Sequence, residues 1–377
     1  MNTVLGIIGG GQLGKMLLQY VSRLSLTTHV YDQSEESPCK NLCNSFTVGS
    51  FMDYDKILEF GRKCKVLTFE IEHINVQALK QLEKENVIVY PKPSTLEIIQ
   101  NKHTQKDFFV KNSVPTSNFT LYKSLNEVKK AISENIIKLP CVWKKTTMGY
   151  DGYGVKIIKI IDDLIPLTDG ECIIEEYIKI DKEISVIASR NPSKQIKLYS
   201  PVEMIFNNES NQVEYVSQPV NISKYSNERM NTIANTIVNN LNHVGVLAIE
   251  FFISMDGEIL VNELAPRPHN SGHLTIESCC PTSQFEQHIR CILDLPLGNT
   301  EFSEPAIMLN LVGSEKYTGP AKYTNIEEIF KLKNTNLHIY GKKQTKPNRK
   351  MGHITIVGGF NLLERAKKLK EKIKVIT

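Results

Sequence analysis

The sequence has no long hydrophobic run and no strong excess of charge of one sign. None of its apolar stretches approaches the roughly 20 residues that a membrane-spanning helix needs, so we expect no membrane partner. The formal net charge of +4 is small for 377 residues, which argues against a protein that coats nucleic acid. A predicted strand begins at once, with no basic leader before it, and we therefore expect a cytoplasmic protein.

Paired cysteine motifs are lacking as well. Eight cysteines are scattered through the chain, several of them inside apolar strand patterns. Cys39 and Cys43, like the adjacent Cys279 and Cys280, have no second pair at the spacing of a metal site. We therefore predict reduced and mostly buried thiols, as in a cytosolic protein.

A glycine motif near the start of the chain predicts an anion-binding turn. The residues from Gly9 to Gly14 read Gly-Gly-Gly-Gln-Leu-Gly, after a buried strand and before an amphipathic helix, and a second strand ends at Asp32. This is the context of the dinucleotide fingerprint, and taken alone it indicates binding of NAD. The motif is only moderately specific, because glycines before a helix N-terminus hold any phosphate or anion.

Alternating strands and helices continue to about residue 89 and predict a parallel α/β domain. Glu70 and Glu72 follow its fourth strand, at the edge where ligands of such sheets bind, and the alternative for each is a solvated loop residue. Length alone suggests two or three domains. The expected boundaries give an N-terminal Rossmann-like domain over 1–98, a second domain over 99–298 and a small C-terminal β-rich domain over 299–377.

The stretch from Val246 to His273 carries the strongest functional signal. Two apolar runs flank Asp256-Gly257, which predicts a β-hairpin with a two-residue turn. Cross-strand partners would then have residue numbers that sum to 513, and Glu250 would lie directly opposite Glu263. Like charges at such a position destabilise a sheet.

The two facing carboxylates require a counter-charge, and a hard divalent cation supplies it. Mg²⁺ typically takes one or two carboxylates and completes its shell with water and substrate phosphates. The alternative is two solvated glutamates at a sheet edge. The polar residues that follow the hairpin favour the metal site, because a sheet edge needs no such cluster: they are Arg267, His269, Asn270 and His273.

A glycine-rich loop over 146–154 connects two strands of the second domain. Three glycines in a loop between strands predict a flexible flap whose backbone N–H groups close over phosphates. Lys144, at the base of the loop, would reach a phosphate as a point charge. The alternative is a surface hairpin with an ordinary lysine.

Two further charged segments are candidates for ligand binding. Glu175 and Glu176 end an apolar strand, where they are either solvated or bind an amine and a ribose hydroxyl beside the flap. The densest basic segment runs from Lys342 to Lys350 and includes Arg349. Because the chain is not broadly basic, we interpret this segment as a clamp for a single phosphate, with a solvated loop as the alternative.

Taken together, these motifs resemble the ATP-grasp superfamily and, within it, the 5-(carboxyamino)imidazole ribonucleotide synthases. The resemblance spans almost the whole chain, and its most specific part is the sequence from Asn262 to His273, followed by the flap from Gly149 to Gly154. It implies a pre-ATP-grasp N-terminal domain, an ATP-grasp domain with a flap subdomain over about 113–180, and the small C-terminal domain.

The resemblance also implies a reaction. ATP would phosphorylate bicarbonate to carboxyphosphate, which delivers its carboxyl group to the exocyclic amine of 5-aminoimidazole ribonucleotide, with release of ADP and phosphate. The implied cofactors are ATP and Mg²⁺, with Mn²⁺ as an alternative metal, and the implied assembly is a homodimer. The implied pathway is purine biosynthesis.

Residue roles are carried over by position. Glu250 and Glu263 are implied as metal ligands, and Arg267 and His269 as the catalytic residues that orient bicarbonate and the carboxylated product. The nucleotide contacts implied are Lys102, Lys144, Gly149, Tyr150, Asp151, Gly152, Tyr153, Gly154, Val155, Glu175, Glu176, Tyr177, Ile178, Glu183, Asn262 and Glu263. The residues implied to face the imidazole ribonucleotide are Gln12, Leu13 and Glu72, with Lys342 and Arg349 on its 5′-phosphate.

Three positions depart from the family pattern. Lys102 stands where relatives usually carry an arginine, which keeps the charge and loses bidentate geometry. No histidine lies near Phe206, where many relatives have one, and Met148 precedes Gly149 where paired glycines are common.

Other functions remain as alternatives. Within the fold, the rivals are a formate-dependent glycinamide ribonucleotide transformylase and a biotin carboxylase. Outside it, the glycine motif with Asp32 leaves an NAD-dependent oxidoreductase open. A catalytically inactive nucleotide-binding module is the last alternative, although it would predict a broken metal pair.

Overall fold

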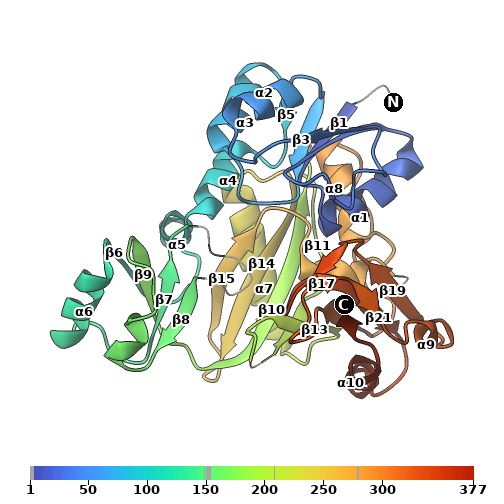
Figure 1. Ribbon diagram of the computed structural model, residues 1–377. Coiled ribbons are helices and arrows are strands. Elements are labelled where there is room, and N and C mark those ends of the chain that lie inside the picture. The colour runs from blue at the N-terminus through green and yellow to red at the C-terminus, as the bar shows by residue number, and fades with distance from the viewer. Residues whose placement is uncertain (1–3, 148, 150–153, 208, 278–279) are drawn as a thin grey trace.

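The structure is a computed structural model that describes residues 4–147, 149, 154–207, 209–277 and 280–377. The N-terminal domain is a parallel sheet in the order β3-β2-β1-β4-β5 with helices on both sides (Figure 1). Its elements are β1 (Val4–Ile8), α1 (Gln12–Val21), β2 (Thr27–Asp32), β3 (Ser45–Val48), α2 (Tyr54–Gly61), β4 (Val66–Phe69), α3 (Val76–Lys84), β5 (Ile88–Val89) and α4 (Pro93–Gln100). The predicted parallel α/β domain is confirmed.

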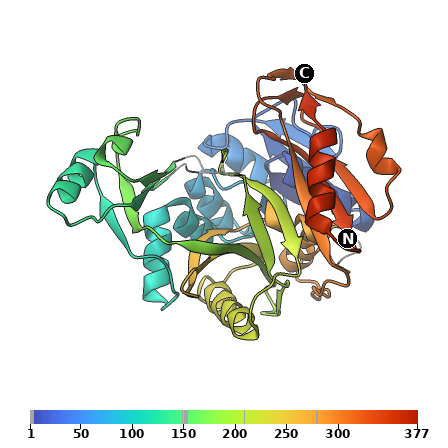
Figure 2. The same ribbon diagram turned by 90° about the horizontal axis from the view of Figure 1, so that it is seen from below.

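The flap subdomain projects to one side of the molecule, at the left of Figures 1 and 2. Its antiparallel sheet has the order β6-β9-β7-β8, and helix α6 packs on one face. The elements are α5 (Lys102–Lys111), which leads into the subdomain, β6 (Phe119–Tyr122), α6 (Leu125–Ser133), β7 (Cys141–Lys145), β8 (Val155–Ile158) and β9 (Cys172–Glu176).

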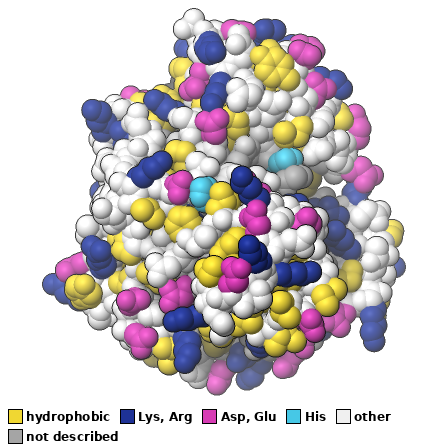
Figure 3. Space-filling model, turned by 90° about the vertical axis from the view of Figure 1, so that its left-hand side faces the viewer, with side chains coloured by type: hydrophobic (Ala, Val, Ile, Leu, Met, Phe, Trp, Pro, Cys, Tyr) yellow, Lys and Arg dark blue, Asp and Glu magenta, His cyan; other side chains and the backbone are white. Residues whose placement is uncertain are grey.

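Hydrophobic and charged side chains of both signs are interspersed over the face of the molecule that Figure 3 shows.

The central sheet is antiparallel and runs through two of the predicted domains. Its order is β15-β14-β10-β12-β13-β16-β21-β19, with β11 paired to β10. The strands are β10 (Ile180–Arg190), β11 (Ile196–Leu198), β12 (Val202–Phe206), β13 (Val213–Gln218), β14 (Gly245–Ser254), β15 (Ile259–Ala265), β16 (Ala306–Val312), β19 (Thr335–Ile339) and β21 (Lys350–Val357). The C-terminal strands thus extend the sheet of the second domain, and the boundary at 298/299 stays a prediction.

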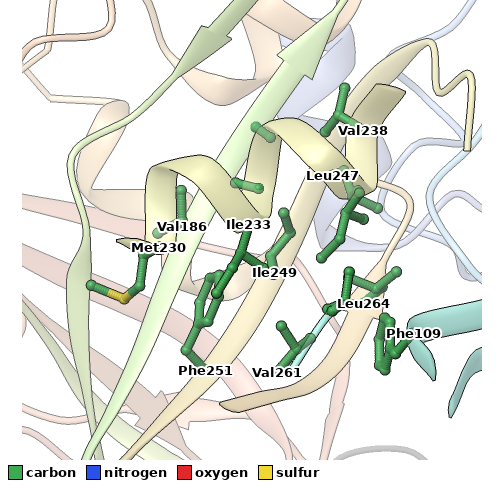
Figure 4. Close-up of a cluster of buried hydrophobic side chains, with 14 of the residues drawn as sticks. Phe109, Val186, Met230, Ile233, Val238, Leu247, Ile249, Phe251, Val261 and Leu264 are labelled. Carbon is green, nitrogen blue, oxygen red and sulfur yellow. The ribbon is translucent and has the colours of Figure 1, made fainter. Parts of the chain in front are cut away.

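Helix α7 (Lys224–Asn240) covers one face of this sheet and forms the largest core (Figure 4). Met230, Ile233 and Val238 recur at helical spacing and pack on alternate residues of β14, among them Ile249 and Phe251. This buried face fixes the orientation of β14, so that Glu250, the residue between Ile249 and Phe251, is directed to the opposite side.

The remaining elements complete the C-terminal part of the chain. They are η3 (Asn270–Thr275), α8 (Gln284–Ile292), β17 (Gly319–Pro320), β18 (Lys322–Tyr323), α9 (Glu327–Phe330), β20 (Gln344–Thr345), α10 (Leu362–Lys372) and β22 (Val375–Ile376). Helix α10 packs on the C-terminal strands at the edge of the molecule opposite the flap subdomain (Figure 2). Among the described helices, none combines the length and apolar character needed to cross a bilayer.

Candidate active site

Glu250 on β14 and Glu263 on β15 are paired across the hairpin, as predicted. The turn that connects their strands differs from the prediction. Ser254 and Glu258 close the loop with a hydrogen bond of 3.0 Å from the Ser254 N–H to the Glu258 carbonyl, so three residues form the turn and near it the partner numbers sum to 512. The predicted two-residue turn was therefore wrong.

A β-bulge restores the facing pair. The register shifts by one residue between Glu250 and Phe251, whose partner is Val261, and this leaves Asn262 as the extra residue. An extra residue in one strand re-aims the side chains beside it. Asn262 accordingly reaches the active-site side, where its Oδ1 accepts a hydrogen bond of 2.9 Å from the Lys144 ammonium.

Each carboxylate of the pair has a nitrogen-bearing side chain of another element as its neighbour. The Lys102 ammonium lies 2.5 Å from Glu263 Oε2, and His269 Nε2 lies 3.4 Å from Glu250 Oε1. The Ser271 N–H donates to His269 Nδ1, which directs the proton of the neutral ring to Nε2.

The two glutamates respond oppositely to their surroundings. Burial and the neighbouring charge of Glu263 raise the pKa of Glu250, whereas Lys102 holds the pKa of Glu263 well below its usual range. When two carboxyl groups lie this close, their pKa values move apart, so that one of them ionises more readily than the other.

Mg²⁺ fits this pair of oxygen donors. Among the residues that the structure describes, no three His, Cys, Asp or Glu side chains come together closely enough to hold a metal by themselves. Two carboxylates with the remaining positions left to water and phosphate is the arrangement that Mg²⁺ prefers beside a nucleotide. Glu250 and Glu263 are therefore the residues that would hold it.

Lys144 is held by a buried acid. Its ammonium lies 3.1 Å from Glu175 Oε2, and Glu175, which is only 3% exposed, also receives a hydrogen bond of 2.8 Å from the Ser117 hydroxyl. A second lysine, Lys106, lies 3.3 Å from the other oxygen of the same carboxylate. Glu175 thus directs its side chain toward two lysines.

The rest of the predicted adenine side lies at the end of β9. Glu176 accepts a hydrogen bond of 2.8 Å from the Asn118 amide, and Tyr177 is 38% exposed. Ile178 follows in the connection to β10, where Glu183 pairs in register with Phe252. Burial raises the pKa of Glu183 to about 7, partly offset by Lys144.

The glycine loop is filled by acids of the chain itself. The Gly10 N–H donates to Asp32 at 2.7 Å, and the Gly11 N–H donates to Glu70 at the same distance. A pyrophosphate needs these backbone donors, so a dinucleotide cannot use them while the carboxylates are in place. This arrangement disfavours the oxidoreductase alternative.

The residues predicted to orient bicarbonate and to face the acceptor come from three separate elements. Arg267 lies 2.8 Å from Glu72 through its Nη2, which joins the end of β15 to the N-terminal domain. Gln12 and Leu13 begin α1 beside the glycine loop, Gln12 partly exposed and Leu13 buried. The predicted contacts are thus grouped at the junction of the first two domains.

Lys342 and Arg349 lie in the loops between β19 and β21. The Lys342 ammonium donates to the Lys350 carbonyl at 2.7 Å, and Arg349 donates to the Gln344 carbonyl at the same distance. Burial raises the pKa of Glu70, and the charge of Lys342 partly offsets that shift, which places the basic loop within electrostatic range of the glycine loop.

The flap itself is described only at its ends. Gly154, with a φ of +78°, and Val155 begin the return strand, and the Gly154 carbonyl accepts a hydrogen bond of 2.8 Å from the Lys145 N–H. Gly149 is described as an isolated residue. The other predicted flap contacts lie outside the described residues: they are Tyr150, Asp151, Gly152 and Tyr153.

Two charged residues of this region were missed as site candidates or misjudged from the sequence. Lys106 was not singled out, because a lysine on a helix is normally solvated, and this one is buried where β9 and the 115–117 connection meet α5. Glu70 was treated as an edge residue, yet it is 6% exposed and burial raises its pKa to about 7. Its position directly after a buried strand and opposite the glycine motif was the available signal.

Three family models match successive parts of the chain. They are described as the ribonucleotide synthetase preATP-grasp domain for residues 1–100, the ATP-grasp domain for 107–285 and the phosphoribosylaminoimidazole carboxylase C-terminal domain for 306–363. The N5-carboxyaminoimidazole ribonucleotide synthase of Bacillus subtilis is 37% identical and covers 94% of this chain and 91% of its own length. Relatives named phosphoribosylaminoimidazole carboxylase are longer, and the chain spans 64% of the one from Vigna aconitifolia.

Solved structures agree over the full length. The N5-carboxyaminoimidazole ribonucleotide synthetase of Thermotoga maritima has 40% identity and a TM-score of 0.90, and covers 100% of this chain and 99% of its own. The N5-carboxyaminoimidazole synthase of Aspergillus clavatus, in complex with ADP and 5-aminoimidazole ribonucleotide, has 29% identity and a TM-score of 0.86 and covers 97% and 96%. The chain belongs to the N5-carboxyaminoimidazole ribonucleotide synthase family of ATP-grasp ligases.

Proposed function

We propose that this protein carboxylates 5-aminoimidazole ribonucleotide in purine biosynthesis, with ATP and bicarbonate as the other substrates. The observation that carries the proposal is the facing pair Glu250–Glu263, with the Lys102 ammonium beside one carboxylate and the His269 ring beside the other. Membership of the family and the acceptor named in the Aspergillus clavatus complex support the choice of substrate.

The first chemical step is phosphoryl transfer. A bicarbonate oxygen attacks the γ-phosphorus of ATP, the bond to the β,γ-bridging oxygen breaks, and carboxyphosphate and ADP result. Such transfer depends mainly on positioning and on neutralising the phosphate charge. Mg²⁺, when bound by Glu250 and Glu263, supplies part of that neutralisation. Lys102 and Lys144 supply the rest, because both ammonium groups lie beside the metal pair or its neighbour Asn262.

The second step transfers the carboxyl group. The exocyclic amine forms a bond to the carboxyl carbon, phosphate leaves, and the amine loses one proton as the carbamate forms. Arg267 and His269 orient the bicarbonate and the product. The Nε–H of Arg267 is buried and has no hydrogen-bond partner among the described residues, which leaves a donor for an anionic oxygen. The flap over 149–155 excludes water, which would otherwise hydrolyse carboxyphosphate.

The acceptor lies between the N-terminal domain and the basic loop in this proposal. Gln12, Leu13 and Glu72 face its ring, and Lys342 and Arg349 bind its 5′-phosphate. The adenine of ATP is framed largely by backbone groups of the segment from Glu175 to Ile178, with Glu183 on the ribose. A homodimer in the cytoplasm and domain boundaries at 98/99 and 298/299 complete the proposal.

A coupled assay of ADP release tests the acceptor. We expect turnover that requires Mg²⁺, with Mn²⁺ as a substitute, and that rises only when both bicarbonate and 5-aminoimidazole ribonucleotide are present. Stimulation by formate with glycinamide ribonucleotide would support the transformylase instead. Turnover of NADH would contradict the ligase assignment altogether.

A further inference from the structure

Lys106 is a buried lysine at the junction between the flap subdomain and the rest of the chain. It is 3% exposed, and its ammonium donates hydrogen bonds of 2.6 Å to the Thr116 hydroxyl and 2.8 Å to the Ser117 hydroxyl. It also lies 3.3 Å from Glu175 Oε1. A lysine held this far from water is retained only with an anionic partner and satisfied donors.

Glu175 is shared between two ammonium groups. Oε1 faces Lys106 at 3.3 Å, and Oε2 faces Lys144 at 3.1 Å. Lys144 also donates a hydrogen bond of 2.9 Å to the neutral amide of Asn262. The cluster of Lys106, Glu175 and Lys144 therefore carries two positive charges and one negative charge, which leaves one positive charge for an incoming phosphate.

The same cluster ties the flap subdomain to the central sheet. Residues 115–117 connect α5 to β6, and the Thr116 hydroxyl donates to the Val261 carbonyl at 2.7 Å while the Val261 N–H donates to the Pro115 carbonyl at 2.8 Å. Lys106 on α5 thus contacts this connection, and Glu175 on β9 belongs to the subdomain itself. Val261 precedes Asn262, the bulged residue whose side chain accepts a hydrogen bond from Lys144.

We propose that Lys106 is a positioning residue, which neutralises Glu175 so that Lys144 remains available to bind a nucleotide phosphate. Without the Lys106 charge, Glu175 keeps a full negative charge for Lys144 alone, and the phosphate must compete with it. The inference depends on the proposed function only in that the ligand of Lys144 is the phosphate of a nucleotide. The identity of the acceptor does not enter.

A double-mutant cycle separates this role from a merely structural one. Lys106→Met removes the charge with little change in volume, and we expect the dissociation constant for Mg·ADP, measured by titration calorimetry, to rise about tenfold. Adding Glu175→Gln removes the competing carboxylate, and we expect affinity to return to within about threefold of the unmodified protein. Lys111→Met, an exposed lysine on the same helix, is the matched control and should bind normally.

The second substitution decides the outcome. If the double variant binds Mg·ADP as weakly as Lys106→Met or more weakly, Lys106 supports only the packing of the junction and the proposal is overturned. Because ADP binding needs no acceptor, a protein that failed to carboxylate 5-aminoimidazole ribonucleotide would still give a clear result. Failure of the proposed function and failure of this inference are therefore distinguishable.

The unmodified protein offers an independent readout if Lys106→Met does not fold. Burial lowers the pKa of Lys106 to about 8, with Glu175 on β9 opposing that shift and Lys144 on β7 and Lys102 on α5 adding to it. Above pH 8 the neutral Lys106 should act like the methionine variant, so Mg·ADP binding should weaken several-fold between pH 7 and 9. A flat profile would overturn the proposal.

Discussion

The N-terminal glycine loop and the Glu250–Glu263 hairpin contain similar groups in opposite arrangements. In the loop, the carboxylates of Asp32 and Glu70 already accept the backbone N–H groups of Gly10 and Gly11. In the hairpin, two carboxylates face each other, and their partners are the Lys102 ammonium and the His269 ring, two side chains that a ligand can draw away. A motif thus identifies the groups present, whereas the residues that face them decide what they bind.

We expect the largest loss of activity when one carboxylate of the hairpin pair is replaced. Glu263→Gln keeps the shape and removes one of the two metal charges, so we expect kcat for ADP release to fall about 10³-fold. Thermal unfolding and circular dichroism should show an intact fold. Glu258→Gln, an exposed residue on the same hairpin, is the control and should retain activity. Turnover within threefold of normal in Glu263→Gln would contradict the metal assignment.

The strands and the facing glutamates of the hairpin could be predicted from the sequence, whereas the length of its turn and the position of its bulge could not. The alternation of apolar residues and the turn signal predicted two strands with facing glutamates, and the structure has both. The turn has three residues, however, and the bulge at Asn262 compensates for the difference. Where the extra residue falls depends on the contact between Asn262 and Lys144, which comes from another subdomain. Local pattern cannot supply such a contact.

The same limit applies to the domains. Helices and strands of the N-terminal part follow the predicted order because hydrophobic periodicity is a local property. Strand β16 pairs with β13 and so continues the central sheet. This pairing joins segments far apart in the sequence, so local periodicity does not predict it. The burial of Lys106 has the same origin, since it requires β9 and the 115–117 connection to meet on α5.

Two glycines with a positive φ allow a direct test of the contrast between loop and hairpin. Gly9 has a φ of +100°, and an added Cβ would lie 2.7 Å from Glu70 Cγ. Gly257 has a φ of +83° with nothing within 4 Å. We expect Gly9→Ala to cost about 3 kcal/mol of unfolding free energy and Gly257→Ala about 1 kcal/mol, since only the first adds a clash to the backbone strain. Urea unfolding measures both free energies. Equal losses for the two variants would contradict a clash between the added Cβ at Gly9 and Glu70.

The buried acid of the loop should make stability depend on pH. Burial raises the pKa of Glu70 from 4.5 to about 7, so the folded state binds more protons than the unfolded state in this range. By linkage, stability falls as the pH rises from about 4.5 to 7. Glu70→Gln cannot ionise, and it should stabilise the protein at pH 8 by on the order of 2 kcal/mol and have little effect at pH 4.5.

Urea unfolding at the two pH values checks this effect of Glu70. Glu59→Gln, a carboxylate on the surface of the same domain, is the control, and its effect should be small at both values. A gain for Glu70→Gln of the same size at pH 4.5 and at pH 8 would mean that Glu70 is not held with a raised pKa.

The smallest expected effect concerns Lys102, which neutralises Glu263 in the hairpin. Lys102→Arg keeps that charge and adds a planar fork that can bind a phosphate through two hydrogen bonds. The fork can also bind Glu263 in the same way, so the gain toward the nucleotide is partly cancelled. We expect KM for ATP to fall about threefold with kcat within twofold, because the phosphates carry more charge than one carboxylate. Lys102→Met is the paired control and should raise KM about tenfold. If Lys102→Arg raised KM instead, the arginine would prefer Glu263 to the phosphates. The cation at position 102 would then be bound to Glu263 too tightly for a nucleotide to draw it away.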